Sequence, residues 1–149
     1  MARSVAISLA NRTSKERDLT YWLAVLAYVV PTFPLGYFWH LKTFAPVYAR
    51  LEMYRNDVII PMGLGSMILQ GLFFAWAYPK LFDTSADHWL SSALQFWLIF
   101  GVLAWSFLVL PVAAKYRMTS VKTFLMLETA FTAIQFAIAG VLLALVYRA

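Results

Sequence analysis

The chain has 149 residues, of which 62% are hydrophobic and 13% are charged, against about 45–50% and about 25% in typical soluble domains. This composition excludes an ordinary soluble domain and predicts a protein embedded in a membrane. The absence of cysteine excludes disulfides, thiolate metal sites and cysteine nucleophiles. A net charge of +5 suits contact with anionic lipid head groups. We do not expect nucleic acid as a partner, because the predicted membrane spans leave no soluble domain to bind it.

Four apolar stretches are long enough for transmembrane helices, which need about 20 residues to cross a hydrocarbon core of about 30 Å. They cover residues 19–39, 58–78, 89–110 and 123–147, after a polar, basic tail at residues 1–18. We expect the tail to be unstructured and the first span to be uncleaved. The sequence therefore predicts an all-α polytopic membrane protein, a single four-transmembrane-helix bundle over residues 1–149 with no second domain.

Prolines predict irregularities in three of the four spans. Pro31 and Pro34, followed by Gly36, are expected to kink the outer half of the first span, because a proline has no backbone N–H to donate. Pro61 falls in the first turn of the second span, where the missing donor costs little. Pro111 is expected to end the third span.

The connection between the first and second spans, residues 40–57, has a helical periodicity of its own. Five apolar or aromatic residues share one face of it, and three basic residues lie outside that face: Phe44, Val47, Tyr48, Leu51 and Tyr54 against Lys42, Arg50 and Arg55. This pattern predicts a short interfacial helix. The alternative is that the first helix runs on past the membrane.

Glu128 is the only Asp, Glu, Lys or Arg inside the four predicted spans. A charge at the bilayer centre costs at least about 2.5–3.5 kcal/mol, so such residues usually face other helices, water or a partner. Thr132 and Gln135 follow at i+4 and i+7 and share its helix face. Gln70, near the middle of the second span, is placed to hydrogen-bond Gln135, and the hydroxyl of Ser106 is a further candidate partner for Glu128.

The predicted depth of Glu128 brings it near four residues that are candidate ion-pair partners: His40, Lys42, Lys115 and Arg117. Three interpretations of the polar stripe remain open. It is a polar seam between helices or subunits, a proton-coupled or ligand-binding site, or the location of a catalytic carboxylate. Catalysis is the least favoured, because no second carboxylate or metal ligand lies in the predicted spans to form an acid–base pair.

Small residues in the second span predict close helix packing: Gly63, Gly65, Ser66 and Gly71. A self-association face or a groove facing a substrate is the alternative. No metal site is predicted, since Asp83, Asp87 and His88 are explained by a polar loop with helix-capping acids. His40 and His88 fall on opposite sides of the membrane, which argues against a haem that needs both, and the sequence identifies no cofactor.

The orientation in the membrane is weakly encoded, because the 12 Lys and Arg residues divide equally between the two predicted sides. The basic N-terminal tail favours both termini in the cytoplasm, since the first segment usually dominates topology. We expect the location to be a bacterial inner membrane.

Three segments carry a resemblance to known proteins: YRNDVIIPMGLGSMILQG at the start of the second span, YPKLF at its end and TFLMLETAFTAIQF in the fourth. With the layout of residues 39–147, they resemble small bacterial four-span membrane proteins grouped as domains of unknown function. The resemblance implies the fold and carries over no functional residue. Small multidrug-resistance transporters are similar in having four spans and one membrane Glu, but they are shorter and carry that Glu on the first helix.

The sequence favours a membrane protein without enzymatic activity, which helps to assemble, stabilise or regulate a larger complex. Its expected partners are membrane lipids and another protein or a second copy of the chain. The alternative is a small transporter or binder of an amphipathic or cationic ligand, in which Glu128 supplies the coupling or counter-charge group.

Overall fold

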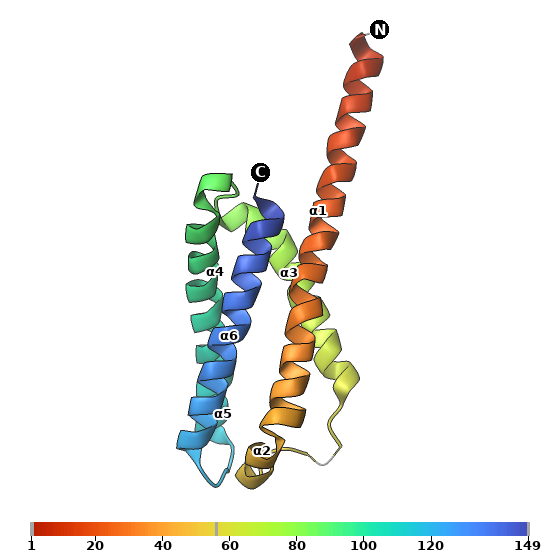
Figure 1. Cartoon of the computed structure of the whole chain (residues 1–149). Helices are drawn as coiled ribbons and strands as arrows, with labels where there is room; N and C mark the ends of the chain where they lie inside the picture. Colours follow the sequence, from red (N-terminus) through yellow and green to blue (C-terminus); the bar gives the residue numbers. More distant parts are fainter. Residues whose placement is uncertain (1, 56, 149) are drawn as a thin grey trace.

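The computed structural model describes the backbone of residues 2–55 and 57–148, and the side chains of these residues from Thr13 onward. Within these residues the chain is all-α (Figure 1). Four long helices form the bundle: α1 (Ala2–Phe38), α3 (Ile60–Leu81), α4 (Trp89–Ala104) and α6 (Val121–Tyr147). Shorter elements extend or join them: η1 (Trp39–Thr43), α2 (Ala45–Leu51), η2 (Ala86–His88), η3 (Trp105–Val109) and α5 (Leu110–Lys115).

Four helical segments are long and apolar enough to cross a membrane: Thr13–Thr43, Ile60–Leu81, Ala86–Lys115 and Val121–Tyr147. The prediction of an all-α four-helix membrane fold is therefore confirmed. Both termini lie toward one end of the bundle, and α2 and the connection between α5 and α6 lie at the other (Figure 1). We call the second end the α2 end.

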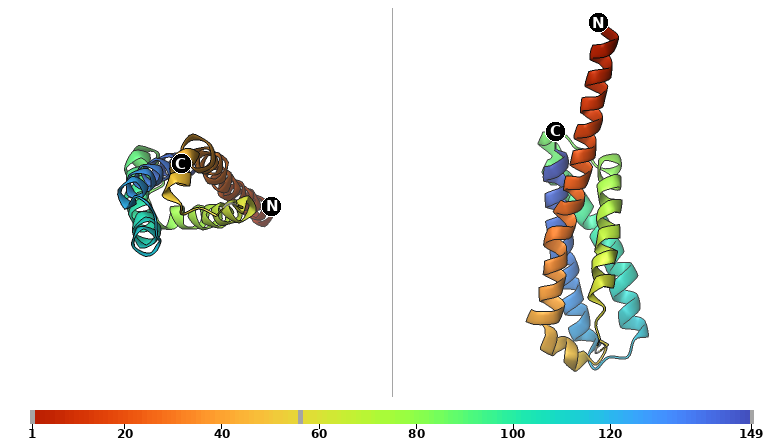
Figure 2. Two further views of the ribbon diagram at one scale, coloured as in Figure 1. Left: turned by 90° about the horizontal axis from the view of Figure 1, so that it is seen from below. Right: turned by 90° about the vertical axis from the view of Figure 1, so that its right-hand side faces the viewer.

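Helix α6 is the centre of the bundle. It packs against α4 on one side and α1 on the other, and α3 packs against α1 (Figure 2). The α3 helix crosses the bundle at an angle, so that it approaches α4 near the termini and diverges from it toward the α2 end (Figure 1). Phe74 of α3 bridges the region where they approach, with ring centroids 5.1 Å from Phe96 and 5.0 Å from Phe100 of α4.

The first span begins differently from its prediction, because the tail is helical from Ala2 rather than unstructured. Pro31 and Pro34 lie inside α1, which continues to Phe38, and the expected kink at these prolines stays a prediction. The irregularity comes immediately afterwards, in the π-helical turn η1. Between the two prolines, the Thr32 hydroxyl donates to the Tyr28 carbonyl of its own helix at 2.6 Å.

The prediction that Pro111 ends the third span is wrong, because α5 continues to Lys115. The π-helical turn η3 comes just before it, so Pro111 lies in the first turn of a new α-helical segment. Because helical turns continue on both sides of Pro111, its missing N–H is a gap inside the helix, and the wider π-helical turn η3 stands next to that gap.

The predicted interfacial helix is confirmed as α2 (Ala45–Leu51). Tyr48 and Leu51 are buried in a cluster with Val109 of η3 and Phe124 of α6. Glu52 ends α2 in the left-handed conformation, with φ of 57°. Thr119 then ties α2 to the start of α6, because its hydroxyl donates to the Arg50 carbonyl at 2.6 Å. These contacts hold α2 against η3 and the start of α6 at this end of the bundle.

The small residues pack differently from the prediction. Gly71 does lie against another helix, since a Cβ there would meet Val29 and Tyr28 of α1 at 3.0 and 3.3 Å. A Cβ at Gly63 or Gly65 would meet no described atom within 4 Å, and the exposed Ser66 hydroxyl donates to the Gly63 carbonyl of its own helix. These three residues therefore make no close helix contact among the described residues: Gly63 lines the space between the end of α1 and the start of α3, and the Ser66 side chain is exposed.

Among the described glycines, the one with the tightest contact to another helix is a residue that the sequence did not single out. A Cβ on Gly140 of α6 would lie 2.7 Å from the Ala93 carbonyl oxygen of α4. Only a residue without a side chain allows this separation. Gly140 therefore sets the distance between α4 and α6.

We predict that Gly140→Ala destabilises the bundle by about 1–3 kcal/mol, the usual cost of overpacking, because α4 and α6 must separate. Gly65→Ala is the matched control. It should leave stability unchanged or raise it by up to about 1 kcal/mol, since alanine favours a helix and nothing opposes its Cβ. Unfolding by SDS in mixed micelles measures both. Equal effects of the two changes would contradict this account of the α4–α6 contact.

Candidate functional site

The carboxylate of Glu128 is held by residues from two other elements. The Tyr48 hydroxyl of α2 donates to Glu128 Oε1 at 2.6 Å, and His40 Nε2 of η1 lies 3.2 Å from the same oxygen. The side chain of Glu128 is 15% exposed and that of His40 is 20% exposed. The only charged residue of the predicted spans is therefore tied to the end of the first helix and to the interfacial helix.

Local structure brings these partners to Glu128. The π-helical turn η1 widens the end of the first span, and His40 Nδ1 lies 2.9 Å from the Gly36 carbonyl oxygen, which fixes the imidazole. Tyr48 points from the buried face of α2 and stacks on Tyr54, with ring centroids 4.8 Å apart and planes at 7°. Three segments of the chain thus converge on one carboxylate.

Burial and the nearby carboxylate of Glu128 both change the pKa of the two tyrosines at the α2 end. Burial raises the pKa of Tyr48, and its hydrogen bond to Glu128 and the negative charge there raise it further. Burial, followed by the charge of Glu128, also raises the pKa of Tyr54. Both phenols therefore keep their protons well above the pH at which an exposed tyrosine ionises.

A second polar group lies deeper along α6. Gln135 Nε2 donates to the Tyr28 hydroxyl at 3.0 Å, and that hydroxyl donates to Gln70 Oε1. Gln135 and Gln70 are therefore linked through Tyr28 rather than by the direct bond expected from the sequence. Tyr28 was missed because a tyrosine in an apolar span resembles an ordinary core or interfacial residue.

The predicted stripe lines a cavity of about 370 Å³ where α3 diverges from α4. We call it the α3–α4 cavity. Glu128, Thr132, Gln135 and Gln70 all contribute to its wall, and the rest of the lining is apolar or aromatic. Sequence spacing placed three of these residues on one helix face, and the packing of α3 added Gln70.

Each of these four residues carries a polar atom without a hydrogen-bond partner among the described residues. The known bonds use Glu128 Oε1, Gln135 Nε2 and Gln70 Oε1, which leaves Glu128 Oε2, Gln135 Oε1, Gln70 Nε2 and Thr132 Oγ1. The buried side-chain polar atoms that lack a partner in the described chain are Trp39 Nε1 and Tyr78 OH, so these four atoms are accessible. They form a set of donors and acceptors along an apolar cavity.

Two further cavities meet at His40. One of about 570 Å³ lies between the end of α1 and the start of α3, and we call it the α1–α3 cavity. The other, about 480 Å³, lies beside α2 and includes Tyr48, Glu52 and Arg55; we call it the α2 cavity. His40 borders both, whereas Glu128 borders the α3–α4 cavity. The His40–Glu128 pair therefore lies between the α3–α4 cavity and the α2 cavity, whereas Met67 and Phe131 line both the α3–α4 and the α1–α3 cavities.

The remaining candidates lie away from Glu128. Ser106 donates to the Leu103 carbonyl of its own helix at 3.0 Å. Lys42 lies over the Tyr37 ring, 5.8 Å from its centroid. Lys115 and Arg117 are exposed and form no ion pair within the described chain. Of the four expected ion-pair partners, the structure brings only His40 to Glu128 within the described residues.

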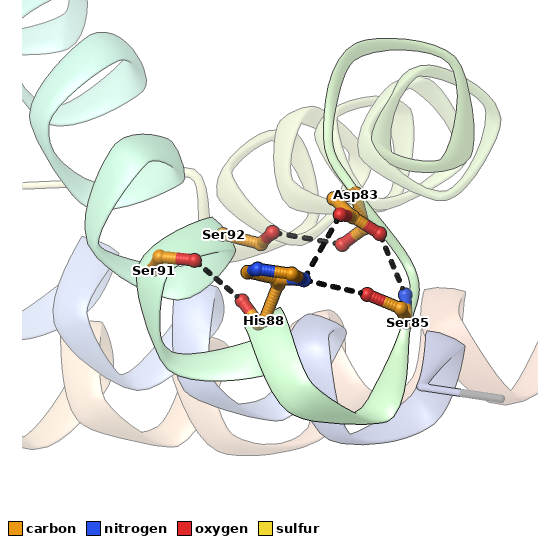
Figure 3. A network of polar contacts seen from close by, with 5 residues as sticks. All are labelled: Asp83, Ser85, His88, Ser91 and Ser92. Carbon is orange, nitrogen blue, oxygen red and sulfur yellow. Dashed lines mark hydrogen bonds and ion pairs between the residues drawn. The ribbon is translucent and has the colours of Figure 1, made fainter.

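Polar side chains near His88 form hydrogen bonds and an ion pair in the connection between α3 and α4 (Figure 3). Asp83 Oδ1 accepts from the Ser85 backbone N–H at 2.8 Å, and His88 Nδ1 lies 3.2 Å from Asp83 Oδ2. The bond from Ser85 lowers the pKa of Asp83. The buried hydroxyl of Ser92 donates to the Asp83 carbonyl at 2.7 Å. Among the described residues no cluster of His, Asp and Glu has the arrangement of a metal site.

Comparisons with protein-family models, with curated proteins and with solved structures find no match to this chain.

We predict that Tyr48→Phe lowers stability near neutral pH by about 1.5–3 kcal/mol, the range for a hydrogen bond to a charged group. The deficit should shrink as pH rises above 10.0, the ordinary pKa of tyrosine. Above that pH the unfolded wild type releases the Tyr48 proton while the folded wild type retains it, so the free energy of unfolding of the wild type falls. The variant has no phenol at position 48, and its free energy of unfolding does not fall for this reason. SDS unfolding across pH measures this.

Tyr116→Phe is the control, because Tyr116 is exposed and lies outside the site. It should match the wild type at every pH. Parallel stability curves for Tyr48→Phe and the wild type above pH 10.0 would contradict the coupling between Tyr48 and Glu128.

Proposed function

We propose that the protein binds an amphipathic molecule in the α3–α4 cavity. The observation that supports this most directly is the set of four accessible, unpartnered polar atoms along an otherwise apolar wall. Unsatisfied polar groups at membrane depth are costly, and a ligand with polar groups of its own offsets that cost. A volume of about 370 Å³ falls in the range of small-molecule sites.

The way in which Glu128 is held also supports a binding site. Tyr48 and His40 both engage Oε1, so one face of the carboxylate is fixed while Oε2 remains for another group. Binding sites of this kind combine a mostly apolar wall with a few positioned polar groups. The carboxylate is positioned by residues 80 and 88 positions away in sequence, which ties the site to the packed fold rather than to one helix.

We predict that a neutral photoactivatable alcohol with a short alkyl chain labels α3, α4 and α6 around the cavity when the protein is in lipid nanodiscs. Ala104 lines this cavity, so Ala104→Leu fills part of it and should reduce labelling at least several-fold. Ala130→Leu is the matched control, because Ala130 is on the exposed surface of α6. Peptide mass spectrometry reads the sites. Labelling spread evenly over the exposed helix faces, in both variants alike, would refute the proposal.

A second candidate is an accessory subunit that stabilises a larger membrane complex. It is favoured by the N-terminal part of α1, whose backbone projects beyond the ends of the other helices (Figure 2). We predict that mild solubilisation of native membranes recovers a complex with a second protein, and that removing the projecting turns releases it. A strictly monomeric protein without a co-purifying partner would count against this candidate.

A further inference from the structure

The hydrogen bonds of His40 determine where its protons are. Nδ1 lies 2.9 Å from the Gly36 carbonyl oxygen, which only accepts hydrogen bonds, so Nδ1 carries a proton. In a neutral imidazole Nε2 then has a lone pair rather than a proton. That lone pair would face Glu128 Oε1, an acceptor 3.2 Å away that already receives the Tyr48 hydroxyl.

Two facing lone pairs do not form a hydrogen bond, so the contact requires one more proton, either on His40 Nε2 or on the Glu128 carboxyl group. In both arrangements the pair as a whole is electrically neutral. The His40–Glu128 pair therefore stores one exchangeable proton at the boundary between the α3–α4 cavity and the α2 cavity.

The wall of the α3–α4 cavity indicates which ligand would compete with this proton. Five aromatic rings line it, from Phe74, Phe100, Phe107, Phe131 and Phe136. Aromatic faces attract organic cations, and the attraction grows when water is excluded. Glu128 is the one ionisable residue among the described residues that line this cavity, so the electrostatic preference there is for positive charge.

The other charged and titratable groups near the pair lie at the α2 end. Tyr48 and Tyr54 come from α2 and the segment after it, and Glu52 and Arg55 border the α2 cavity. Arg55, which also borders the α1–α3 cavity, makes that side less suited to a cation. Helices α3 and α4 and the η3 turn add only apolar residues and the uncharged Gln70 to the wall of the α3–α4 cavity.

Charge balance connects the cation to the proton. A cation entering while the pair keeps its proton leaves an uncompensated positive charge in a region of low dielectric constant, which is costly. If the pair releases the proton, the Glu128 carboxylate balances the cation and His40 becomes neutral. The proton passes from the pair to water through the α2 cavity, which His40 and Tyr48 border.

We propose that the α3–α4 cavity takes a lipophilic organic cation, and that the binding of one cation expels the one proton held between His40 and Glu128. This rests on the proposed function, because it assigns a ligand class to the same cavity. It adds a stoichiometry, one proton released for each cation bound. It also adds a direction, because the cation enters the α3–α4 cavity and the proton leaves through the α2 cavity.

Benzyltrimethylammonium and its neutral carbon isostere, neopentylbenzene, test the proposal with the full-length protein in weakly buffered detergent. The cation should displace the photoactivatable alcohol and release one proton per site, measured with a pH electrode. Its affinity should rise up to about tenfold per pH unit while the pair is protonated, as linkage to one proton requires. The neutral isostere should release no proton.

Three variants distinguish the role of Glu128 in binding the cation from the role of His40 in holding the proton. Glu128→Gln should abolish both cation binding and proton release. His40→Gln keeps an amide donor toward Glu128 and should bind the cation without releasing a proton. Asp87→Asn is the control, since this exposed acid lies between α3 and α4, away from α2, and lines none of the three cavities, and it should behave as the wild type. Size-exclusion profiles and retained labelling by the neutral alcohol show that each variant is folded.

Equal displacement of the alcohol by the cation and the isostere, without proton release, would overturn this inference while leaving the proposed amphipath site standing. Proton release that persists in Glu128→Gln would also overturn it. Failure of the alcohol to label the cavity in the wild type would remove the proposed function itself, and the inference with it.

Discussion

The convergence of Tyr48 and His40 on one oxygen of Glu128 is the interaction on which the α2 end depends. It joins η1, α2 and α6, three segments far apart in the chain, at a single carboxylate. An acid at membrane depth is stable only when its charge is compensated or its proton retained. The interfacial helix is therefore part of the polar site as well as a connection, because its buried face supplies Tyr48.

The same packing that satisfies Glu128 on one side opens the α3–α4 cavity on the other. Phe74 holds α3 against α4 near the termini, and Gly71 lets α3 approach α1 closely. Beyond these contacts α3 diverges from α4 toward the α2 end (Figure 1). The cavity is thus a consequence of the angle at which α3 crosses the bundle, and the polar stripe of α6 lines it.

Irregular helical turns contribute to this geometry in both long spans that contain them. The prolines of the first and third spans do not break their helices, and the π-helical turns η1 and η3 lie next to them in the chain. Turns of this kind are frequent at functional sites because they shift the direction in which side chains point. His40 lies on η1, and Val109 at the end of η3 lines the α3–α4 cavity.

The sequence by itself determined the four spans, the interfacial helix and the stripe of Glu128, Thr132 and Gln135, because hydrophobic length and helical periodicity are local properties. The tertiary structure decided which partners meet. It brought His40 rather than Lys42, Lys115 or Arg117 to Glu128, and placed Tyr28 between the two glutamines. It also made Gly140 a close contact and left Gly65 open, although both are helical glycines, because only the neighbouring helix distinguishes them.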